Sequence, residues 1–110
     1  MRILVAENDP TTRNMLEKRL TEWGYQVVVC ENGAHVWEAV QEKDPPNFAV
    51  VDLDMPGMDG RQICFAIREL KKRPHMYLIL SAPSNRETDV IAALEAGMDD
   101  FLIKPIDHLQ

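Results

Sequence analysis

Cysteine, aromatic residues and long apolar runs are all scarce in this 110-residue chain. The two cysteines, Cys30 and Cys64, lack the spacing of metal ligands, and we interpret both as small buried side chains without a redox role. The longest apolar stretches, such as residues 27–30 and 77–80, are far too short to cross a bilayer, and the N-terminus lacks the pattern of a signal peptide. We therefore expect a cytoplasmic protein without membrane contacts.

Basic residues are also in the minority. The chain has 12 Lys and Arg against 18 Asp and Glu, which gives a formal net charge of -6. Nucleic-acid binding depends on clustered Lys and Arg, so we expect no direct nucleic-acid binding by this segment. With 45% hydrophobic and 27% charged residues, the composition is that of one globular domain over residues 1–110 with a single core.

Five short apolar runs are spaced along the chain, and each is continuous rather than alternating. Continuous runs rich in Val, Ile and Phe indicate strands buried on both faces of a sheet. The runs are Ile3 to Ala6, Val27 to Cys30, Phe48 to Val51, Tyr77 to Leu80 and Phe101 to Ile103.

Segments with helical spacing separate these runs. Their apolar positions are Leu16, Leu20 and Trp23; Val36 and Val40; Ile63, Ile67 and Leu70; and Val90, Ala93 and Leu94. Asp9 and Asp59 are placed as N-caps, Ser84 with Glu87 as a capping box, and Gly24 and Gly97 as helix ends. Strands joined by crossover helices run parallel. We predict a doubly wound α/β domain with a five-stranded parallel sheet.

The chain stops soon after the fifth run, at Gln110, where a closing helix has barely begun. A face of the sheet covered by the first helix alone would expose apolar side chains of the first and last strands. We therefore expect a fragment of a longer protein that lacks most of its last helix.

Polar residues at the ends of the first, third, fourth and fifth runs form a candidate site. In open parallel sheets the binding crevice lies beyond the carboxyl ends of the strands, so these side chains are expected to meet there. They are Glu7, Asn8, Asp52, Asp54, Ser81 and Lys104.

The chemistry of this set favours phosphoryl transfer. Two carboxylates ~5 Å apart repel by about 3 kcal/mol at an effective dielectric constant of 20, so a cluster of acids needs a cation. Oxygen ligands favour Mg²⁺, and a carboxylate beside Mg²⁺ can attack phosphorus. Lys104 can pair with the phosphoryl group, and the Ser81 hydroxyl can donate to it. The three histidines, His35, His75 and His108, are far apart in the sequence and are assigned no catalytic role.

Two segments resemble the receiver domain of two-component response regulators. Residues 51–60, VDLDMPGMDG, resemble the phosphorylation loop, and residues 96–105, AGMDDFLIKP, resemble the end of the domain. The resemblance implies a flavodoxin-like sheet with strand order 2-1-3-4-5. It also implies that the domain is a phosphoacceptor rather than an enzyme, catalysing only its own phosphorylation and slow dephosphorylation.

The resemblance implies a role for each site residue. Asp52 would accept the phosphoryl group from a histidine kinase or phosphotransfer protein. Mg²⁺ would be held by Glu7, Asn8, Asp52 and the backbone carbonyl of Asp54. Ser81 would be the switch hydroxyl, Ala82 would keep the phosphoryl pocket small, and Phe101 would be the switch aromatic. The switch would act on an output domain or a downstream protein, with a possible homodimer through the surface of the fourth helix and fifth strand.

Three residues depart from the usual pattern of the family. Asn8 stands where a second acidic metal ligand is usual, so we expect weaker Mg²⁺ binding. Pro83 offers no donor near the switch hydroxyl and Asp54 adds negative charge near the path of the attacking water, so we expect slow self-dephosphorylation. Phe101 replaces the more common tyrosine.

Two other readings stay open. The chain could be a receiver-shaped interaction or dimerisation module that does not depend on phosphorylation, and Asn8 is the main support for that reading. The Asp52-Leu53-Asp54 sequence is also similar to phosphohydrolases of the haloacid dehalogenase type. Those enzymes need a cap and a larger core, and Met55-Pro56 follows here instead of the usual Thr or Val.

Overall fold

The computed structural model describes residues 1–70, 75–82 and 87–104. Its elements are β1 (Arg2–Ala6), α1 (Pro10–Glu22), β2 (Gln26–Cys30), α2 (Gly33–Val40), β3 (Phe48–Asp52), α3 (Gly60–Glu69), β4 (Tyr77–Ala82), α4 (Glu87–Ala96) and β5 (Asp100–Ile103). All neighbouring strands are parallel, and the sheet order is β2-β1-β3-β4-β5. The predicted doubly wound α/β fold and its strand order are confirmed.

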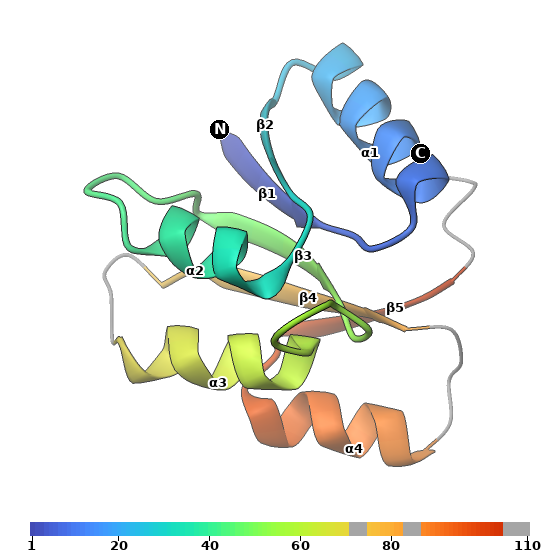
Figure 1. Ribbon diagram of the computed structural model, residues 1–110, viewed down its shortest axis with the longest axis vertical. Helices are drawn as coiled ribbons and strands as arrows, with labels where there is room; N and C mark the ends of the chain where they lie inside the picture. The colour runs from blue at the N-terminus through green and yellow to red at the C-terminus, as the bar shows by residue number, and fades with distance from the viewer. Residues whose placement is uncertain (71–74, 83–86, 105–110) are drawn as a thin grey trace.

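Helices cover both faces of the sheet: α1 lies on one face, and α2, α3 and α4 lie on the other (Figure 1). Along β1 the side chains alternate between the two layers. Leu4 and Ala6 belong to the larger core under α2, α3 and α4, whereas Ile3 and Val5 join Leu16 of α1 in a smaller one. The burial of β1 on both faces explains its continuous apolar sequence.

The helix starts follow the sequence prediction. The Asp9 carboxylate caps α1 by accepting a hydrogen bond from the Thr12 backbone N–H at 2.9 Å. Asp59 caps α3 in a reciprocal capping box with Gln62. Gly24 and Gly97 follow α1 and α4 with φ of 92° and 91°, a conformation that favours glycine. Ser84 of the predicted capping box and the expected truncated helix at residues 105–110 lie outside the described residues.

Two apolar residues were placed wrongly on buried helix faces. Trp23 is 44% exposed because α1 ends at Glu22, and Trp23 caps the helix rather than packing under it. Leu94 is 68% exposed, since the buried positions of α4 are Asp89, Ala93 and Ala96. One residue corresponds to about 100° of helix rotation, so a face centred on Ala93 turns Leu94 outward.

Within the described residues, no helix is long and apolar enough to cross a membrane.

Arg68, in the last turn of α3, contacts the residues that lead into the amino-terminal ends of β4 and β5. Its guanidinium donates to the carbonyls of Met76 and Gly97 at 2.7 and 3.0 Å and to Asp99 Oδ2 at 2.7 Å. The Asp99 carboxylate also accepts from the Leu78 N–H at 2.8 Å and contacts His75 Nε2 at 3.2 Å. The strands that carry Ser81 and Lys104 are therefore anchored at their starts.

These contacts predict a pH-dependent contribution of Asp99 to stability. Burial alone raises the pKa of Asp99, but the Leu78 N–H, His75 and Arg68 together lower it below 3.8. A carboxyl group with a lowered folded-state pKa stabilises the fold above its unfolded pKa, and that contribution is lost as the pH falls through the folded pKa. Asp99→Asn should therefore cost about 1 to 2 kcal/mol at pH 7 and less at pH 3, measured by urea unfolding. Glu69→Gln, at an exposed carboxylate of α3, is the control, and an equal cost for Asp99→Asn at both pH values would contradict the assignment.

Candidate functional site

The carboxyl ends of β1, β3, β4 and β5 meet at one rim of the sheet. Glu7 directly follows β1, Asp52 is the last residue of β3, and Lys104 directly follows β5. Asp52 is paired with Ser81 of β4 in the parallel register. The sequence-predicted residues therefore come from separate strands to one place, as the rule for open parallel sheets requires.

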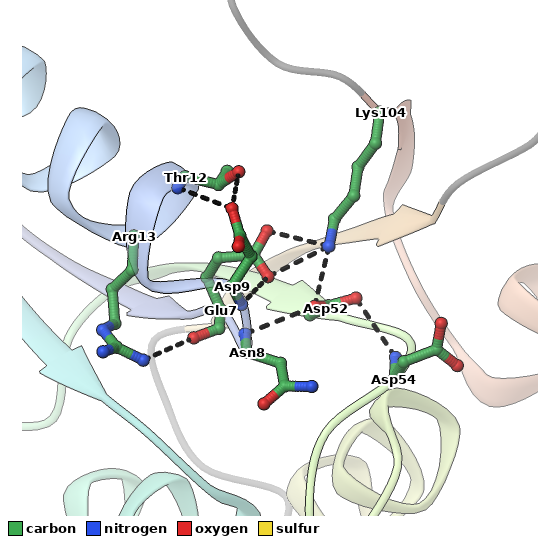
Figure 2. A network of polar contacts seen from close by, with 8 residues as sticks. All are labelled: Glu7, Asn8, Asp9, Thr12, Arg13, Asp52, Asp54 and Lys104. Carbon is green, nitrogen blue, oxygen red and sulfur yellow. Dashed lines mark hydrogen bonds and ion pairs between the residues drawn. The ribbon is translucent and has the colours of Figure 1, made fainter.

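Lys104 joins the two buried acids of this rim. Its Nζ donates to Asp52 Oδ2 at 2.8 Å and to Glu7 Oε2 at 3.0 Å, and it lies 2.9 Å from Glu7 Oε1 (Figure 2). Glu7 and Asp52 are only 2% and 1% exposed. One ammonium group thus compensates two carboxyl groups that have almost no access to water.

Backbone N–H groups hold the Asp52 carboxylate from two sides. The Asp54 N–H donates to Oδ1 at 3.1 Å, and the Asn8 N–H donates to Oδ2 at 3.3 Å. On the neighbouring acid, the Asp9 N–H donates to Glu7 Oε2 at 3.2 Å. The backbone N–H groups of Asn8 and Asp54 thus fix the orientation of the Asp52 carboxylate.

The two acids respond differently to this environment. Burial and the neighbouring Asp52 carboxylate raise the pKa of Glu7, against the effect of Lys104. Burial also acts to raise the pKa of Asp52, but the Glu7 carboxyl, Lys104 and the Asp54 N–H together lower it. Burial disfavours the charged form of Lys104, but the two carboxylates outweigh it and raise the pKa of its ammonium. The environment therefore favours ionisation of Asp52 over ionisation of Glu7.

The Asp54 carboxylate does not join the Glu7–Asp52 pair. The Asp54 side chain is exposed and points away from Asp52, while its backbone faces the Asp52 carboxylate (Figure 2). The Asn8 side chain lies on the side of Asp52 away from Lys104 (Figure 2). Across the described part of the chain, no three His, Cys, Asp or Glu side chains gather as a metal site. The acid cluster thus consists of the Glu7 and Asp52 side chains, and Asp54 takes part through its backbone.

The donor set nevertheless fits a hard divalent cation. Mg²⁺ keeps several water ligands and needs only one or two carboxylates from the protein, with carbonyl or amide oxygens beside them. Among the described residues, Glu7 Oε1 is the one buried side-chain oxygen or nitrogen without a hydrogen bond, despite its closeness to Lys104 Nζ. A buried acid pair that one ammonium only partly satisfies is suited to a further cation.

The remaining predicted residues border the acid pair on β4 and β5. Ser81 and Ala82 are buried, at 2% and 0% exposure. Phe101 pairs with Leu80, and its half-buried side chain packs against the larger core. Cys30 and Cys64 are buried away from the acids, and burial raises the pKa of each thiol to about 11, as expected of inert side chains.

Two residues near the site were missed by the sequence interpretation. Arg13 of α1 donates from Nη1 to the backbone carbonyl of Glu7 at 3.2 Å (Figure 2). Gly60 opens α3 so close to the acceptor that a Cβ there would lie 2.7 Å from the Asp52 carbonyl oxygen. The glycine after the Asp59 cap was a visible signal for close approach, whereas nothing in the sequence points Arg13 to a carbonyl.

Comparison with known proteins decides the family. A family description, response regulator receiver domain, matches residues 3–110. The chain belongs to the receiver domain family. Receiver domains of response regulators act in two-component signalling, where a phosphorylation switch is their general role and histidine kinases and output domains are their partners.

Similar proteins agree with this assignment. The receiver is 37% identical over 110 residues to an uncharacterized 14.6 kDa protein of Leptolyngbya boryana, covering 100% of this chain and 83% of that protein. It is 34% identical over 104 residues to the transcriptional regulatory protein AfsQ1 of Streptomyces coelicolor, covering 94% of this chain and 44% of AfsQ1. This chain thus spans less than half of that regulator.

A solved relative contains a metal ion. The response regulator TrrA of Thermotoga maritima, crystallised in complex with Mg²⁺-BeF, has a TM-score of 0.80 and 26% identity. The match covers 96% of this receiver and 88% of TrrA. Mg²⁺ binding is therefore compatible with this fold.

Removal of the Lys104 ammonium tests the charge balance of the site. Without it, the desolvated acids lose their cation, so Lys104→Met should cost about 2 kcal/mol of unfolding free energy at pH 7 in the presence of a chelator. Urea unfolding measures the loss. Lys18→Met, at an exposed position of α1, is the control. A Lys104→Met protein as stable as the wild type would show that the ammonium does not offset burial of the acids.

Proposed function

We propose that this receiver accepts a phosphoryl group on Asp52, with Mg²⁺ bound, from a histidine kinase or phosphotransfer protein. The observation that carries the proposal is the contact set of one carboxylate. Asp52 is buried, paired with Lys104 at 2.8 Å, and held by two backbone N–H groups. Its lowered pKa keeps it ionised and available as a nucleophile.

The transfer forms an oxygen–phosphorus bond and breaks a phosphorus–nitrogen bond. A carboxylate oxygen of Asp52 attacks the phosphorus of phosphohistidine, and the imidazole nitrogen leaves with the electron pair of the broken bond. The leaving ring is neutral imidazole when its other nitrogen carries the proton. Lys104 Nζ donates a hydrogen bond to the attacking carboxylate and can pair with the phosphoryl oxygens as the bond forms.

Mg²⁺ would be held by the carboxylate of Asp52, the backbone carbonyl of Asp54 and the amide oxygen of Asn8, with Glu7 beside it. When bound, it would neutralise charge on the phosphoryl oxygens and on the acid pair. The added positive charge would lower the pKa of Glu7, whereas burial raises it. The two N–H donors keep Asp52 oriented throughout.

The switch would pass from Ser81 to the α4–β5 surface. The Ser81 hydroxyl, beside Ala82 and across from Asp52 in the sheet, would turn to the phosphoryl oxygens, and Phe101 would turn inward. Three apolar side chains are exposed on this surface: Ile91 at 44%, Leu94 at 68% and Ile103 at 46%. They support contact with an output domain, a downstream protein or a second copy of the chain.

The proposal also covers the bounds of the domain, its location and its lack of nucleic-acid binding. We propose that residues 1–110 form a single cytoplasmic receiver domain, and that this segment does not bind nucleic acid because its net charge is -6. A receiver-shaped module independent of phosphorylation is the second candidate. It is favoured by the exposed amide of Asn8 at the expected metal position.

Phosphorylation in vitro separates the two candidates. Incubation with acetyl phosphate and Mg²⁺ should add the mass of one phosphoryl group to the protein, detected by intact mass spectrometry. Asp52→Asn should abolish the gain because the amide is a poor nucleophile. Asp54→Asn, at the exposed neighbouring acid, should retain it. No gain in the wild type, or the same gain in Asp52→Asn, would reject Asp52 as the acceptor.

The charge at position 8 should set the affinity for Mg²⁺. An amide oxygen can ligate the ion but brings no charge, so Asn8→Asp should tighten Mg²⁺ binding about tenfold, measured by calorimetric titration. Asn14→Asp, at an exposed position of α1, controls for the change in net charge. Equal affinities of Asn8→Asp and the wild type would remove position 8 from the metal site.

A further inference from the structure

The turn between β2 and α2 carries none of the predicted site residues, yet it contacts the loop that does. The N–H of Gly33, the first residue of α2, donates to the Pro56 carbonyl at 3.1 Å. Pro56 lies in the loop from Leu53 to Asp59, between the acceptor strand and α3. A residue from another element of the fold thus supports the middle of the phosphorylation loop.

The loop also leaves no space for a side chain at position 33. A Cβ at position 33 would lie 2.7 Å from Met58 Cβ, 3.0 Å from Met58 N and 3.1 Å from Met58 O. Two of these three atoms are backbone, so a larger side chain could be accommodated only by moving the loop. The backbone of α2 and the backbone of the loop are therefore in direct contact.

The loop is short, and backbone hydrogen bonds also hold its two ends. The Leu53 N–H donates to the Ser81 carbonyl at 2.8 Å, and the Gly60 N–H donates to the Leu53 carbonyl at 2.9 Å. Only Met55 separates Pro56 from Asp54, and Met55 is buried in the larger core at 7% exposure. Pro56 and Asp54 are thus only two residues apart in one short loop, with the buried Met55 between them.

We propose that Gly33 is a positioning residue for phosphoryl transfer: by holding residues 56–58 against α2, it sets the backbone of Asp54 relative to Asp52. This inference rests on the proposed function, because the Asp54 N–H holds the Asp52 carboxylate and its carbonyl is the expected metal ligand. Supports one step removed from a ligand tune metal affinity through orientation. Gly33 itself touches neither phosphate nor metal.

A double-mutant cycle tests the contact. Gly33→Ala should raise the Kd for Mg²⁺, measured by calorimetric titration, roughly tenfold, since it moves a support of a ligand. In the background of Met58→Gly, where the nearest atom is gone and the loop can yield, the same substitution should change the Kd by about twofold or less. Equal fold-changes in the two backgrounds would overturn the inference.

A loss of general stability has a different signature. Ala39→Gly, at a buried position six residues after Gly33 in α2, should lower the melting temperature but leave the Kd for Mg²⁺ unchanged. If Ala39→Gly weakens binding as much as Gly33→Ala does, the role of Gly33 is only structural and the inference fails.

Two further outcomes keep the test decisive. If Gly33→Ala does not fold by circular dichroism, Met58→Gly alone should still weaken Mg²⁺ binding several-fold, since the loop loses its packing on α2; an unchanged Kd would overturn the inference. If the wild-type protein binds no Mg²⁺, the proposed function itself fails. If the wild type binds and Gly33→Ala binds equally well, only the role of Gly33 is rejected.

Discussion

Two desolvated acids next to a single ammonium group form the constraint on which this structure depends. Glu7 and Asp52 are almost completely buried, and Lys104 contacts both. Two carboxylates and one ammonium group would carry a net charge of minus one at a buried place, where charge is costly. Burial and the neighbouring Asp52 carboxylate therefore raise the pKa of Glu7. The same imbalance suits the site to a further cation. Burial acts to raise the pKa of Asp52, but the Glu7 carboxyl, Lys104 and the Asp54 N–H outweigh burial and lower it.

The rest of the fold brings these three side chains together and keeps them there. They are distant in the sequence, and parallel pairing alone aligns the strand ends that carry them. Arg68 and Asp99 anchor the opposite ends of β4 and β5. Close backbone approach at Gly60 and Gly33 packs the acceptor loop between two helices. Under the proposed function, a change at Asp52 would reach α4 and β5, which carry the exposed apolar side chains Ile91, Leu94 and Ile103.

The sequence was sufficient for the five parallel strands and for the meeting of Glu7, Asp52 and Lys104, because buried parallel strands have a distinctive continuous apolar pattern and their carboxyl ends must converge. The strand order came from the resemblance to receiver domains. It was not sufficient for side-chain direction. Asp54 follows Asp52 by two residues but contributes its backbone, since its side chain turns to solvent. Trp23 and Leu94 have the correct helical spacing, but the end of α1 and the small-residue face of α4 leave them exposed. Arg13 and Gly33 act through backbone carbonyls, which no side-chain pattern reveals.

A crystal structure of the protein with Mg²⁺ and beryllofluoride tests the central claim most directly, because beryllofluoride imitates a phosphoryl group on a carboxylate. The account predicts beryllium bonded to an Asp52 oxygen and Lys104 Nζ turned from Glu7 toward a fluorine. It also predicts a metal ion beside Asp52, Asn8 and the Asp54 carbonyl. A structure in which beryllofluoride is absent from Asp52, and Lys104 still joins Glu7 to Asp52 under saturating conditions, would contradict it.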